Sequence, residues 1–468
     1  MRSRGAGMRE EGGATGDEGR GGRGRRIAFV TVGCRLNQFE TDALRGRAEA
    51  ERFTVVPFTE EADVYVINTC TITGEADADS RQLVRRAVRR NPAAAVVVTG
   101  CYAQGASATV AAIPGVDLVL GNLEKAALFR YLREARAPAS RGTRGSPRVR
   151  VADISSVRTL EGDEYGPGID PDRTRAFLKV QDGCGFACSF CIVPAVRGPN
   201  RSLPPERVLT EIRRLHLAGF PEVVLTGIHL GTYGRDLSPR TSLAALCARI
   251  AALSEAPRVR LSSLDPHEVD PGLVRLLADS PRFCRHLHLP LQSGDEGILR
   301  RMRRSHTAAQ FRELVERLAT AVPAIAVTAD VIVGFPGEDE AAFRRTADLL
   351  AALPMAGLHV FRFSPRAGTE AAEFPGQLPA AVKAARSRTL RALAAEKSLA
   401  FRRRAVGESL EVVVLHRARS DGLLEGLSDN ALTLWFPGEP ALMGRRCRVR
   451  VQEIDARGLH GLCVGDVD

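Results

Sequence analysis

Three cysteines lie within eight residues of one another in the segment "GCGFACSFC" (183–191), with the spacing C-x3-C-x2-C: Cys184, Cys188 and Cys191. A structural zinc site is closed by four protein ligands, and a disulfide framework needs an even number of cysteines. Three soft thiolates on a short loop instead suit an iron–sulfur cluster in which one iron keeps an open position. The loop therefore predicts such a cluster; a zinc loop with a remote fourth ligand is the alternative.

Three further cysteines each follow a segment with the pattern of a buried strand. Cys34 follows "RIAFVTVG", Cys70 follows "DVYVINT" and Cys101 follows "AAAVVVTG". The carboxyl ends of parallel strands share one edge of a sheet, and ligands bind there. Cysteine is also a common core residue, so chance placement is the alternative. Because the placement occurs three times, we expect a second thiolate site at this edge.

The composition indicates a soluble globular chain in a reducing compartment. It has 468 residues, of which 44% are hydrophobic and 26% charged, and no run of eighteen apolar residues that would cross a membrane. Residues 1–26 lack the apolar segment of a secretory signal, and we expect a disordered extension there. The expected location is the cytoplasm, where cysteines act as ligands or core residues rather than disulfides. Four of the ten cysteines fit no ligand spacing: Cys247, Cys284, Cys447 and Cys463.

Short apolar runs alternate with helical segments along most of the chain, which predicts βα units and parallel sheets. The first set of units fills residues 27–135, and a segment rich in Pro, Gly, Ser and Arg at 136–172 is expected to be a linker. Six longer units follow in residues 173–402 and predict a partial (β/α)6 barrel, with its site at the carboxyl ends of the strands. The loop with Cys184 follows the first of these strands.

The C-terminal residues 403–468 alternate apolar and polar positions at period two, which predicts a small β-barrel. A basic helix at about 380–404 precedes it. The net charge of +11 fits a polyanionic partner, and equally an arginine-rich composition from a GC-rich genome. The tail itself is formally neutral, so an RNA-binding face would depend on clustered arginines, for which a solvated strand is the alternative: Arg445, Arg446, Arg448 and Arg450.

The loop at 184–191 resembles the cluster loop of radical S-adenosylmethionine enzymes, in which an aromatic residue, here Phe190, precedes the last cysteine. The resemblance implies that the open iron binds the amino and carboxylate groups of S-adenosylmethionine. Reductive cleavage of the sulfonium then releases a 5′-deoxyadenosyl radical. The open position would hold the sulfonium close to the source of the electron.

From residue 27 onward the chain resembles a narrower family, the methylthiotransferases. The resemblance implies a flavodoxin-like N-terminal domain, a radical barrel and a C-terminal TRAM barrel that binds RNA. It implies that Cys34, Cys70 and Cys101 hold a second [4Fe–4S] cluster, and that S-adenosylmethionine is both methyl donor and radical source. The implied partners are tRNA, an electron donor such as flavodoxin or ferredoxin, and a sulfur source; no membrane is involved.

Four segments resemble the subgroup that acts on threonylcarbamoyladenosine in tRNA: "TVGCRLNQFETDA", "NTCTITGEADADSRQ", "VTGCYAQ" and "LTGIHLGTYGRDL". Other subgroups modify isopentenyladenosine in tRNA or an aspartate of a ribosomal protein, and have different residues where this chain has Ile228-His229-Leu230. His229 and Arg235 are our candidates for binding the substrate carboxylate, because an unpaired buried carboxylate is costly. Arg446 and Arg448 are the candidates for tRNA contact.

Further strand ends resemble the S-adenosylmethionine and substrate contacts of the family. Our polar candidates are Gln292, Ser293 and Asp330; for Ser262, also a cofactor candidate, and His288, a supporting or core role is an equal alternative. Gly334 and Gly337 are expected to let the loop turn close to a ligand. Two cations flank the cluster loop and are expected either to contact cofactor carboxylates or to be solvated at the surface: Lys179 and Arg197.

We therefore predict an enzyme that methylthiolates C2 of N6-threonylcarbamoyladenosine at position 37 of tRNA. The rival within the family is methylthiolation of isopentenyladenosine. Rivals from other classes are an iron–sulfur electron carrier or redox sensor, and an RNA-binding protein with structural zinc. A carrier has no need for a six-unit barrel followed by an RNA-binding tail.

Overall fold

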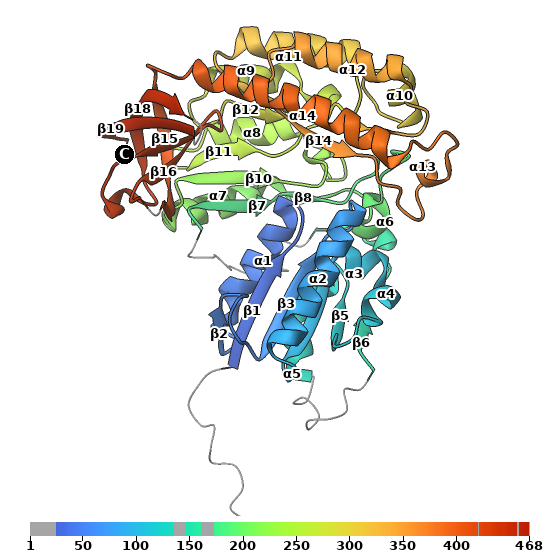
Figure 1. The fold of residues 1–468 in the computed structure, drawn as a ribbon. Helices are drawn as coiled ribbons and strands as arrows, with labels where there is room; N and C mark the ends of the chain where they lie inside the picture. The colour runs from blue at the N-terminus through green and yellow to red at the C-terminus, as the bar shows by residue number, and fades with distance from the viewer. Residues whose placement is uncertain (1–24, 135–145, 161–172, 420, 456–457, 468) are drawn as a thin grey trace, which may run out of the picture.

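The N-terminal unit is a six-stranded parallel sheet in the order β2-β1-β3-β4-β5-β6 (Figure 1). The computed structural model describes residues 25–134, 146–160, 173–419, 421–455 and 458–467. The strands are β1 (Arg25–Thr31), β2 (Phe53–Val56), β3 (Val64–Thr69), β4 (Ala95–Gly100), β5 (Leu118–Leu120) and β6 (Arg148–Arg150). The first five follow the flavodoxin-like order 2-1-3-4-5, as predicted.

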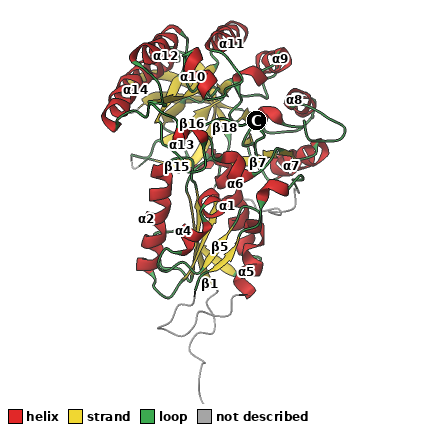
Figure 2. Ribbon diagram, turned by 90° about the vertical axis from the view of Figure 1, so that its right-hand side faces the viewer, coloured by secondary structure: helices red, strands yellow, loops and turns green. Residues whose placement is uncertain are grey.

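Helices cover both faces of this sheet, and β3 is buried along its whole length (Figures 1 and 2). They are α1 (Arg35–Ala48), α2 (Gly74–Arg90), α3 (Cys101–Gly105), α4 (Ser107–Ala111) and α5 (Leu128–Glu134). A strand buried on both faces is continuously apolar, which is why the sequence indicated β1, β3 and β4 clearly. Strands β2 and β5 are too short to give that signal.

Two boundaries differ from the sequence prediction. Strand β1 begins at Arg25, inside the expected extension, most of which lies outside the described residues. The expected linker at 136–172 contributes an edge strand, because β6 pairs with β5 from Arg148 to Arg150. Its alternating arginines suit an edge strand with one exposed side. The rest of that linker is described only at 146–160.

The second unit is a partial barrel of six parallel strands in two halves, β7-β10-β11 and β12-β13-β14. The strands are β7 (Arg175–Lys179), β10 (Glu222–Thr226), β11 (Arg258–Leu261), β12 (His286–His288), β13 (Ala326–Val333) and β14 (Gly357–Arg362). Single parallel bridges join the halves at Val259–Phe283 and Ser263–His288. Within the described residues β7 and β14 do not pair, so the barrel is open on one side, as predicted.

Helices surround the outer face of this barrel, and the longer ones bury apolar side chains against its strands. The longer ones are α7 (Pro205–Leu217), α8 (Leu243–Ala251), α9 (Pro271–Asp279), α11 (Ala308–Ala321), α12 (Glu340–Ala352) and α14 (Ala380–Arg403); the short ones are α6 (Val193–Arg197), α10 (Glu296–Arg301) and α13 (Glu370–Glu373). Strands β8 (Gln181–Asp182) and β9 (Arg201–Ser202) form a small hairpin beside the cluster loop.

The N-terminal unit covers the open side of the barrel (Figure 1). Helix α1 packs against β7 at one edge of the opening. At the other edge, Arg366, just after β14, donates to Thr71 Oγ1 and Asp77 Oδ2, each at 2.6 Å. The Ser364 hydroxyl accepts from the Gly74 amide at 3.2 Å. The carboxyl edge of the N-terminal sheet therefore faces the interior of the barrel.

The interior of the partial barrel is hollow rather than packed. Along β13, alternate side chains are buried against the outer helices, whereas Thr328, Asp330 and Ile332 are half-buried. Their register partners on β14 are Gly357, His359 and Phe361, and His359 and Phe361 are exposed. Side chains of both strands that point away from the helices thus face an open space.

The third unit is a closed barrel in the order β15-β16-β17-β19-β18. Its strands are β15 (Ser409–Ala418), β16 (Leu424–Ser428), β17 (Thr433–Phe436), β18 (Arg446–Asp455) and β19 (Gly458–Asp466). Its interior is filled with buried apolar side chains such as Val412, Leu434, Phe436 and Val449. The sequence predicted this barrel but did not indicate the strand β19.

None of the helices in the described stretches has the length and apolar character that a bilayer crossing requires.

The closed barrel docks where the strands of the partial barrel begin. Glu222 is fully buried and binds Arg258 (2.7 Å) and Arg260 (2.9 Å). These arginines donate onward to backbone carbonyls of the closed barrel, at Leu427 (3.0 Å) and Ser428 (2.9 Å). The carboxyl ends of the strands, with the cluster loop, stay free of this contact.

Candidate active site

The fold brings Cys34, Cys70 and Cys101 to the carboxyl ends of three neighbouring strands, β1, β3 and β4. Cys34 caps α1, Cys70 follows β3 directly, and Cys101 is the first residue of α3. A side chain on Gly33 would put its Cβ 2.6 Å from Cys70 Cβ and 3.0 Å from Cys70 Sγ, so these two loops touch. Gly33 has φ +105°, which favours glycine. We call these three residues the dispersed triad.

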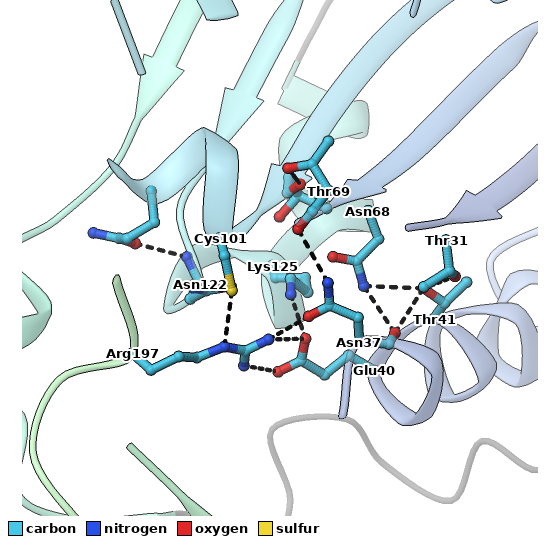
Figure 3. A network of polar contacts seen from close by, with 12 residues as sticks. Thr31, Asn37, Glu40, Thr41, Asn68, Thr69, Cys101, Asn122, Lys125 and Arg197 are labelled. Atoms are coloured by element: carbon cyan, nitrogen blue, oxygen red, sulfur yellow. Dashed lines mark hydrogen bonds and ion pairs between the residues drawn. The ribbon is translucent and has the colours of Figure 1, made fainter. Parts of the chain in front are cut away.

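Buried amides hold the loops of the dispersed triad in place (Figure 3). The Asn37 side chain donates to the carbonyls of Val32 (2.9 Å) and Thr69 (3.0 Å), which precede Cys34 and Cys70. Asn68 donates in turn to the Asn37 carbonyl at 2.9 Å. One asparagine therefore ties two strand ends together, and both asparagines are buried.

A buried cluster of six charged side chains lies beside Cys101. Arg197 donates from Nε to Cys101 Sγ at 3.2 Å and from the guanidinium tip to Glu40 Oε1 at 2.5 Å (Figure 3). Lys125 also pairs with Glu40. The members are Glu40, Lys125, Lys179, Asp182, Arg197 and Arg201, each at most 6% exposed. Within the described residues, four cations and two carboxylates belong to this cluster, so cations outnumber carboxylates beside Cys101, which suits an anionic group there.

The electrostatics of this charged cluster follow from that pairing. Burial opposes the ionised form of Glu40, but Arg197 and Lys125 hold its pKa well below the usual range. Burial raises the pKa of the Cys70 thiol to about 12, a shift that the nearby Cys101 and Cys34 thiols reinforce. Three thiols in mutual electrostatic reach, with no disulfide, fit a metal cluster that would take up their negative charge.

The second group is Cys184, Cys188 and Cys191, which we call the local triad. The Cys184 amide donates to the Gly198 carbonyl (3.0 Å) and the Cys191 amide to the Cys188 carbonyl (3.1 Å), so the loop is folded by its own backbone. Burial raises the pKa of Cys191 to about 12, and the thiols of Cys188 and Cys184 reinforce this shift. All three are free thiols.

Phe190, the aromatic residue of the loop, packs edge-on against Phe335 with ring centroids 6.4 Å apart. It therefore anchors the loop to the apolar cluster behind it rather than pointing at a ligand. Among the described residues, no three His, Cys, Asp or Glu side chains converge closely enough to hold a single metal ion. Each triad offers three thiolates, the donor set of an iron–sulfur cube with one open iron, whereas a structural zinc site takes four protein ligands.

Charged side chains contact the local triad from the ends of other barrel strands. Cys184 Sγ lies 3.3 Å from His229 Nδ1, and His229 Nε2 lies 2.8 Å from Glu268 Oε2. Burial opposes protonation of His229, but these two contacts raise its pKa to about 9. Arg304 donates to Cys188 Sγ at 3.6 Å. The expected candidate Arg235 is half exposed and already pairs with Glu268 at 3.1 Å.

Two expected cofactor residues carry buried polar atoms without a partner. Ser262 Oγ, just after β11, and Gln292 Oε1, after β12, accept and donate no hydrogen bond within the described residues. Gln292 has φ +70°, an unusual backbone for a residue other than glycine, and its backbone pairs with β13. Ser293, in contrast, is buried within hydrogen-bond distance of Thr346 Oγ1 at 3.3 Å. Ser262 and Gln292 thus each carry a buried side-chain oxygen whose hydrogen-bonding capacity is unused within the described residues.

The hollow interior holds a second polar group. His288 Nε2 lies 3.1 Å from Asp330 Oδ1, and its Nδ1 lies 3.0 Å from Thr328 Oγ1. Burial and the neighbouring His288 lower the pKa of His359, and Arg35 of the N-terminal unit lowers it further. Arg35 follows Cys34 directly and also lies within electrostatic reach of Arg175, Glu222 and Arg260, near the starts of β7, β10 and β11. No sequence pattern marks Arg35.

One expectation needs correction. Lys179 and Arg197 are not solvated at the surface: both are buried, with ion pairs to Glu40 and Asp182. Gly334 and Gly337 turn the backbone as expected, with φ of +75° and +82°. A Cβ on Gly334 would lie 2.4 Å from Lys383 Cγ, so its close neighbour there is protein. Gly337 likewise faces its own chain, since its amide donates to the Gly376 carbonyl at 2.9 Å.

The arginines of the closed barrel divide into two kinds. Arg446, Arg448 and Arg450 share the outward face of β18, whereas Arg445 precedes the strand and does not belong to that face. Arg446 pairs with Glu411 at 3.0 Å. Arg448 is exposed and forms no ion pair within the described residues.

The other four cysteines lie on elements that carry neither triad: Cys247 in α8, Cys284 before β12, Cys447 in β18 and Cys463 in β19.

Comparisons with known proteins agree with this geometry. One family model, the Radical SAM superfamily, matches residues 178–350, and another, Uncharacterized protein family UPF0004, matches residues 26–121. Threonylcarbamoyladenosine tRNA methylthiotransferase MtaB of Bacillus subtilis is 37% identical over 91% of this chain and 93% of its own length. The tRNA-2-methylthio-N(6)-dimethylallyladenosine synthase of Moorella thermoacetica is 34% identical over 93% of this chain and 98% of its own.

One solved structure has a similar fold but a low sequence identity to this chain. The radical S-adenosylmethionine methyltransferase TsrM from Kitasatospora setae, solved with cobalamin and a [4Fe–4S] cluster bound, superposes with a TM-score of 0.53 at 17% identity. The match covers 75% of this chain and 77% of that one. At this identity it supports the fold alone.

Proposed function

The chain belongs to the radical S-adenosylmethionine methylthiotransferases, and we propose that it methylthiolates C2 of N6-threonylcarbamoyladenosine at position 37 of tRNA. The observation that carries the proposal is that Arg197, six residues after the last cysteine of the local triad, donates to Cys101 of the dispersed triad at 3.2 Å, so both triads lie at the contact between the N-terminal unit and the barrel. The relatives named for this substrate match over nearly the whole chain.

Each triad receives one cofactor in this proposal. Cys184, Cys188 and Cys191 would hold a [4Fe–4S] cluster that binds S-adenosylmethionine, and Cys34, Cys70 and Cys101 would hold a second. When bound, the first cluster and S-adenosylmethionine would supply the radical that removes hydrogen from C2; the second cluster would hold the sulfur species that a separate source provides, and another S-adenosylmethionine would donate the methyl group. The protein orients these groups: Ser262 Oγ and Gln292 Oε1 offer free hydrogen-bonding atoms, and Asp330 with His288 faces the interior.

The carboxylate of the threonylcarbamoyl group needs a cation or several donors. His229 and Arg235 stand at the end of β10, as the sequence suggested, but both already contact Glu268. We therefore add Arg35, which is within electrostatic reach of His359 in the interior. Arg446 and Arg448 on the closed barrel are the proposed tRNA contacts, and phosphates are the groups that exposed arginines bind.

The remaining requirements follow from the chemistry. The reaction needs an electron donor, such as flavodoxin or ferredoxin, and a sulfur source. We place the protein in the cytoplasm, where tRNA is modified. The rival substrate is isopentenyladenosine, which the similarity to the Moorella thermoacetica enzyme favours. An apolar isopentenyl group would leave a cation facing the interior without a partner, which favours the threonylcarbamoyl group.

Nucleoside mass spectrometry of tRNA tests this proposal. We expect the methylthio derivative of threonylcarbamoyladenosine to disappear from a strain that lacks the gene and to return when the gene is restored. A gene encoding the chain with Cys184, Cys188 and Cys191 replaced by Ala is the matched control and should not restore it. Loss of methylthio-isopentenyladenosine, with the threonylcarbamoyl product intact, would show that the rival substrate is correct.

A further inference from the structure

We propose that Arg197 is a positioning residue that donates an N–H···S hydrogen bond from the barrel domain to the cluster of the N-terminal domain and raises the reduction potential of that cluster. The inference rests on the proposed function, in which Cys101 ligates the second cluster. It concerns how the two sites are held together and tuned, which the family assignment does not specify.

Arg197 belongs to one domain and makes its contacts in the other. It ends α6, six residues after Cys191, so the local triad and Arg197 form one continuous segment. Its side chain reaches Asn37 and Glu40 of α1 and Cys101 of α3 (Figure 3). Asn122 of the N-terminal domain donates back to the Val196 carbonyl at 2.7 Å. The two triads are therefore joined through α6.

The contacts fix the plane of the guanidinium. Its two terminal nitrogens bind Glu40 and Asn37, with Nη1 at 2.5 Å and Nη2 at 3.2 Å from the Glu40 oxygens. With both ends held, the remaining Nε–H points at Cys101 Sγ, 3.2 Å away. Arg197 is fully buried, so water does not compete for these donors. A lysine can keep the charge near Glu40 but has no planar fork to direct a separate donor at the sulfur.

A donor and a positive charge at a ligand sulfur act on the redox state of a cluster. Reduction adds a negative charge, which an N–H donor and a nearby cation stabilise, so the reduction potential rises. Within the described residues, cations outnumber carboxylates in the charged cluster around Arg197, which acts in the same direction. The hydrogen bond exists only while the domains are docked, so it also ties the potential to docking.

A purely structural ion pair is the competing explanation, and its consequences differ. Loss of a structural contact would lower thermal stability and the yield of both clusters. It would leave the potential and the electron paramagnetic resonance spectrum of the second cluster, where that cluster forms, as they were. The potential and the spectrum are therefore the deciding measurements.

The experiment uses the full chain with both clusters reconstituted under anaerobic conditions. Redox titrations followed by electron paramagnetic resonance would be compared for the parent, R197K and R197Q. Variants with either triad replaced by Ala assign each signal to a cluster. The matched control is R173Q, because Arg173 also joins the barrel to α1, through Asp42 at 3.1 Å. R197K keeps the charge beside Glu40, so it remains informative if R197Q does not fold.

We expect R197K to lower the potential of the second cluster and change its spectrum, with the first cluster unchanged. R197Q should lower it further, and R173Q should match the parent. If the second cluster forms in R197K with the potential and spectrum of the parent, the inference is wrong and the proposed function stands. If the parent binds no iron at Cys34, Cys70 and Cys101, the proposed second cluster itself is wrong, and the inference falls with it.

Discussion

The local triad lies within one loop at 184–191, whereas the dispersed triad comes from three strand ends between residues 34 and 101. The loop is folded by its own backbone hydrogen bonds and by one to the nearby Gly198. The dispersed triad depends instead on the order of β1, β3 and β4 and on the Asn37 side chain that ties two of their ends. A change far from the cysteines can therefore damage the dispersed triad while the local one survives.

The local triad and the dispersed triad also differ in the side chains that surround them. The loop sits at the mouth of a hollow barrel, beside buried oxygens that have no partner in the described residues. The dispersed triad sits against a pocket with excess positive charge, contributed largely by the barrel domain. One site is suited to binding a small polar molecule, and the other to holding a buried anionic group. The two can be tested separately.

Removing the triads should give the largest effects. Replacing Cys34, Cys70 and Cys101 with Ala should abolish methylthiolated tRNA yet leave cleavage of S-adenosylmethionine to 5′-deoxyadenosine. Replacing Cys184, Cys188 and Cys191 should abolish both. Anaerobically reconstituted parent should hold about eight irons, and each triple variant about half of that, because each cube has four.

Iron analysis and product chromatography measure these outcomes together. Full iron content in either triple variant, or zinc in place of iron, would contradict the assignment of the triads. So would a lack of 5′-deoxyadenosine in the first variant when its remaining cluster is intact.

The next largest effect should come from adding one methyl group at Gly33, which should lower the iron content of the dispersed triad alone. In Gly33→Ala the new Cβ would lie 2.6 Å from Cys70 Cβ, at a φ that alanine rarely adopts. We expect loss of most iron from the dispersed triad and normal iron at the local triad. The matched control is Gly219→Ala, at φ +82° but with no atom within 4 Å of its Cβ. Equal iron loss in both variants would mean that backbone strain alone, and not contact with Cys70, decides the outcome.

The sequence predicted much of this arrangement because its strongest signals are local. Apolar runs ending at Cys34, Cys70 and Cys101 indicated the strand ends, and the helical segments between apolar runs indicated the βα units of both domains. Short or polar strands gave no such signal: β6 has two arginines in three residues, and it was assigned to a linker.

The charged cluster could not be predicted, because its members are distant in sequence. Glu40, Lys125 and Arg197 are each typical of a solvated surface, and only the docking of two domains buries them together. The one available signal was position: Arg197 closes the first helix after the cluster loop. Sequence patterns report what one segment buries, whereas a site between domains depends on which surfaces meet.

Arg35 tests whether the dispersed triad also helps to read the substrate. Arg35→Gln removes a charge that lies within electrostatic reach of His359 but leaves every cysteine in place. We expect kcat/KM for tRNA with threonylcarbamoyladenosine to fall by about 10- to 100-fold, the loss of one charge-assisted hydrogen bond. Arg35→Lys should recover part of it. Iron content and 5′-deoxyadenosine formation should not change, and the exposed Arg89→Gln in α2 is the control. An unchanged kcat/KM would remove Arg35 from the proposed pocket.

The smallest effect should come from the closed barrel, which touches neither triad. Arg448 is exposed with no ion pair in the described residues, whereas Arg446 is partly neutralised by Glu411 at 3.0 Å. If this face binds tRNA phosphates, Arg448→Gln should weaken tRNA binding a few-fold and lower the slope of log Kd against log salt by about 1. Arg446→Gln should have a smaller effect on tRNA binding, because Glu411 already neutralises part of the Arg446 charge. Both variants should keep the iron content and 5′-deoxyadenosine yield of the parent. Binding curves at several salt concentrations measure the difference, and identical slopes in all three proteins would place the tRNA on another face.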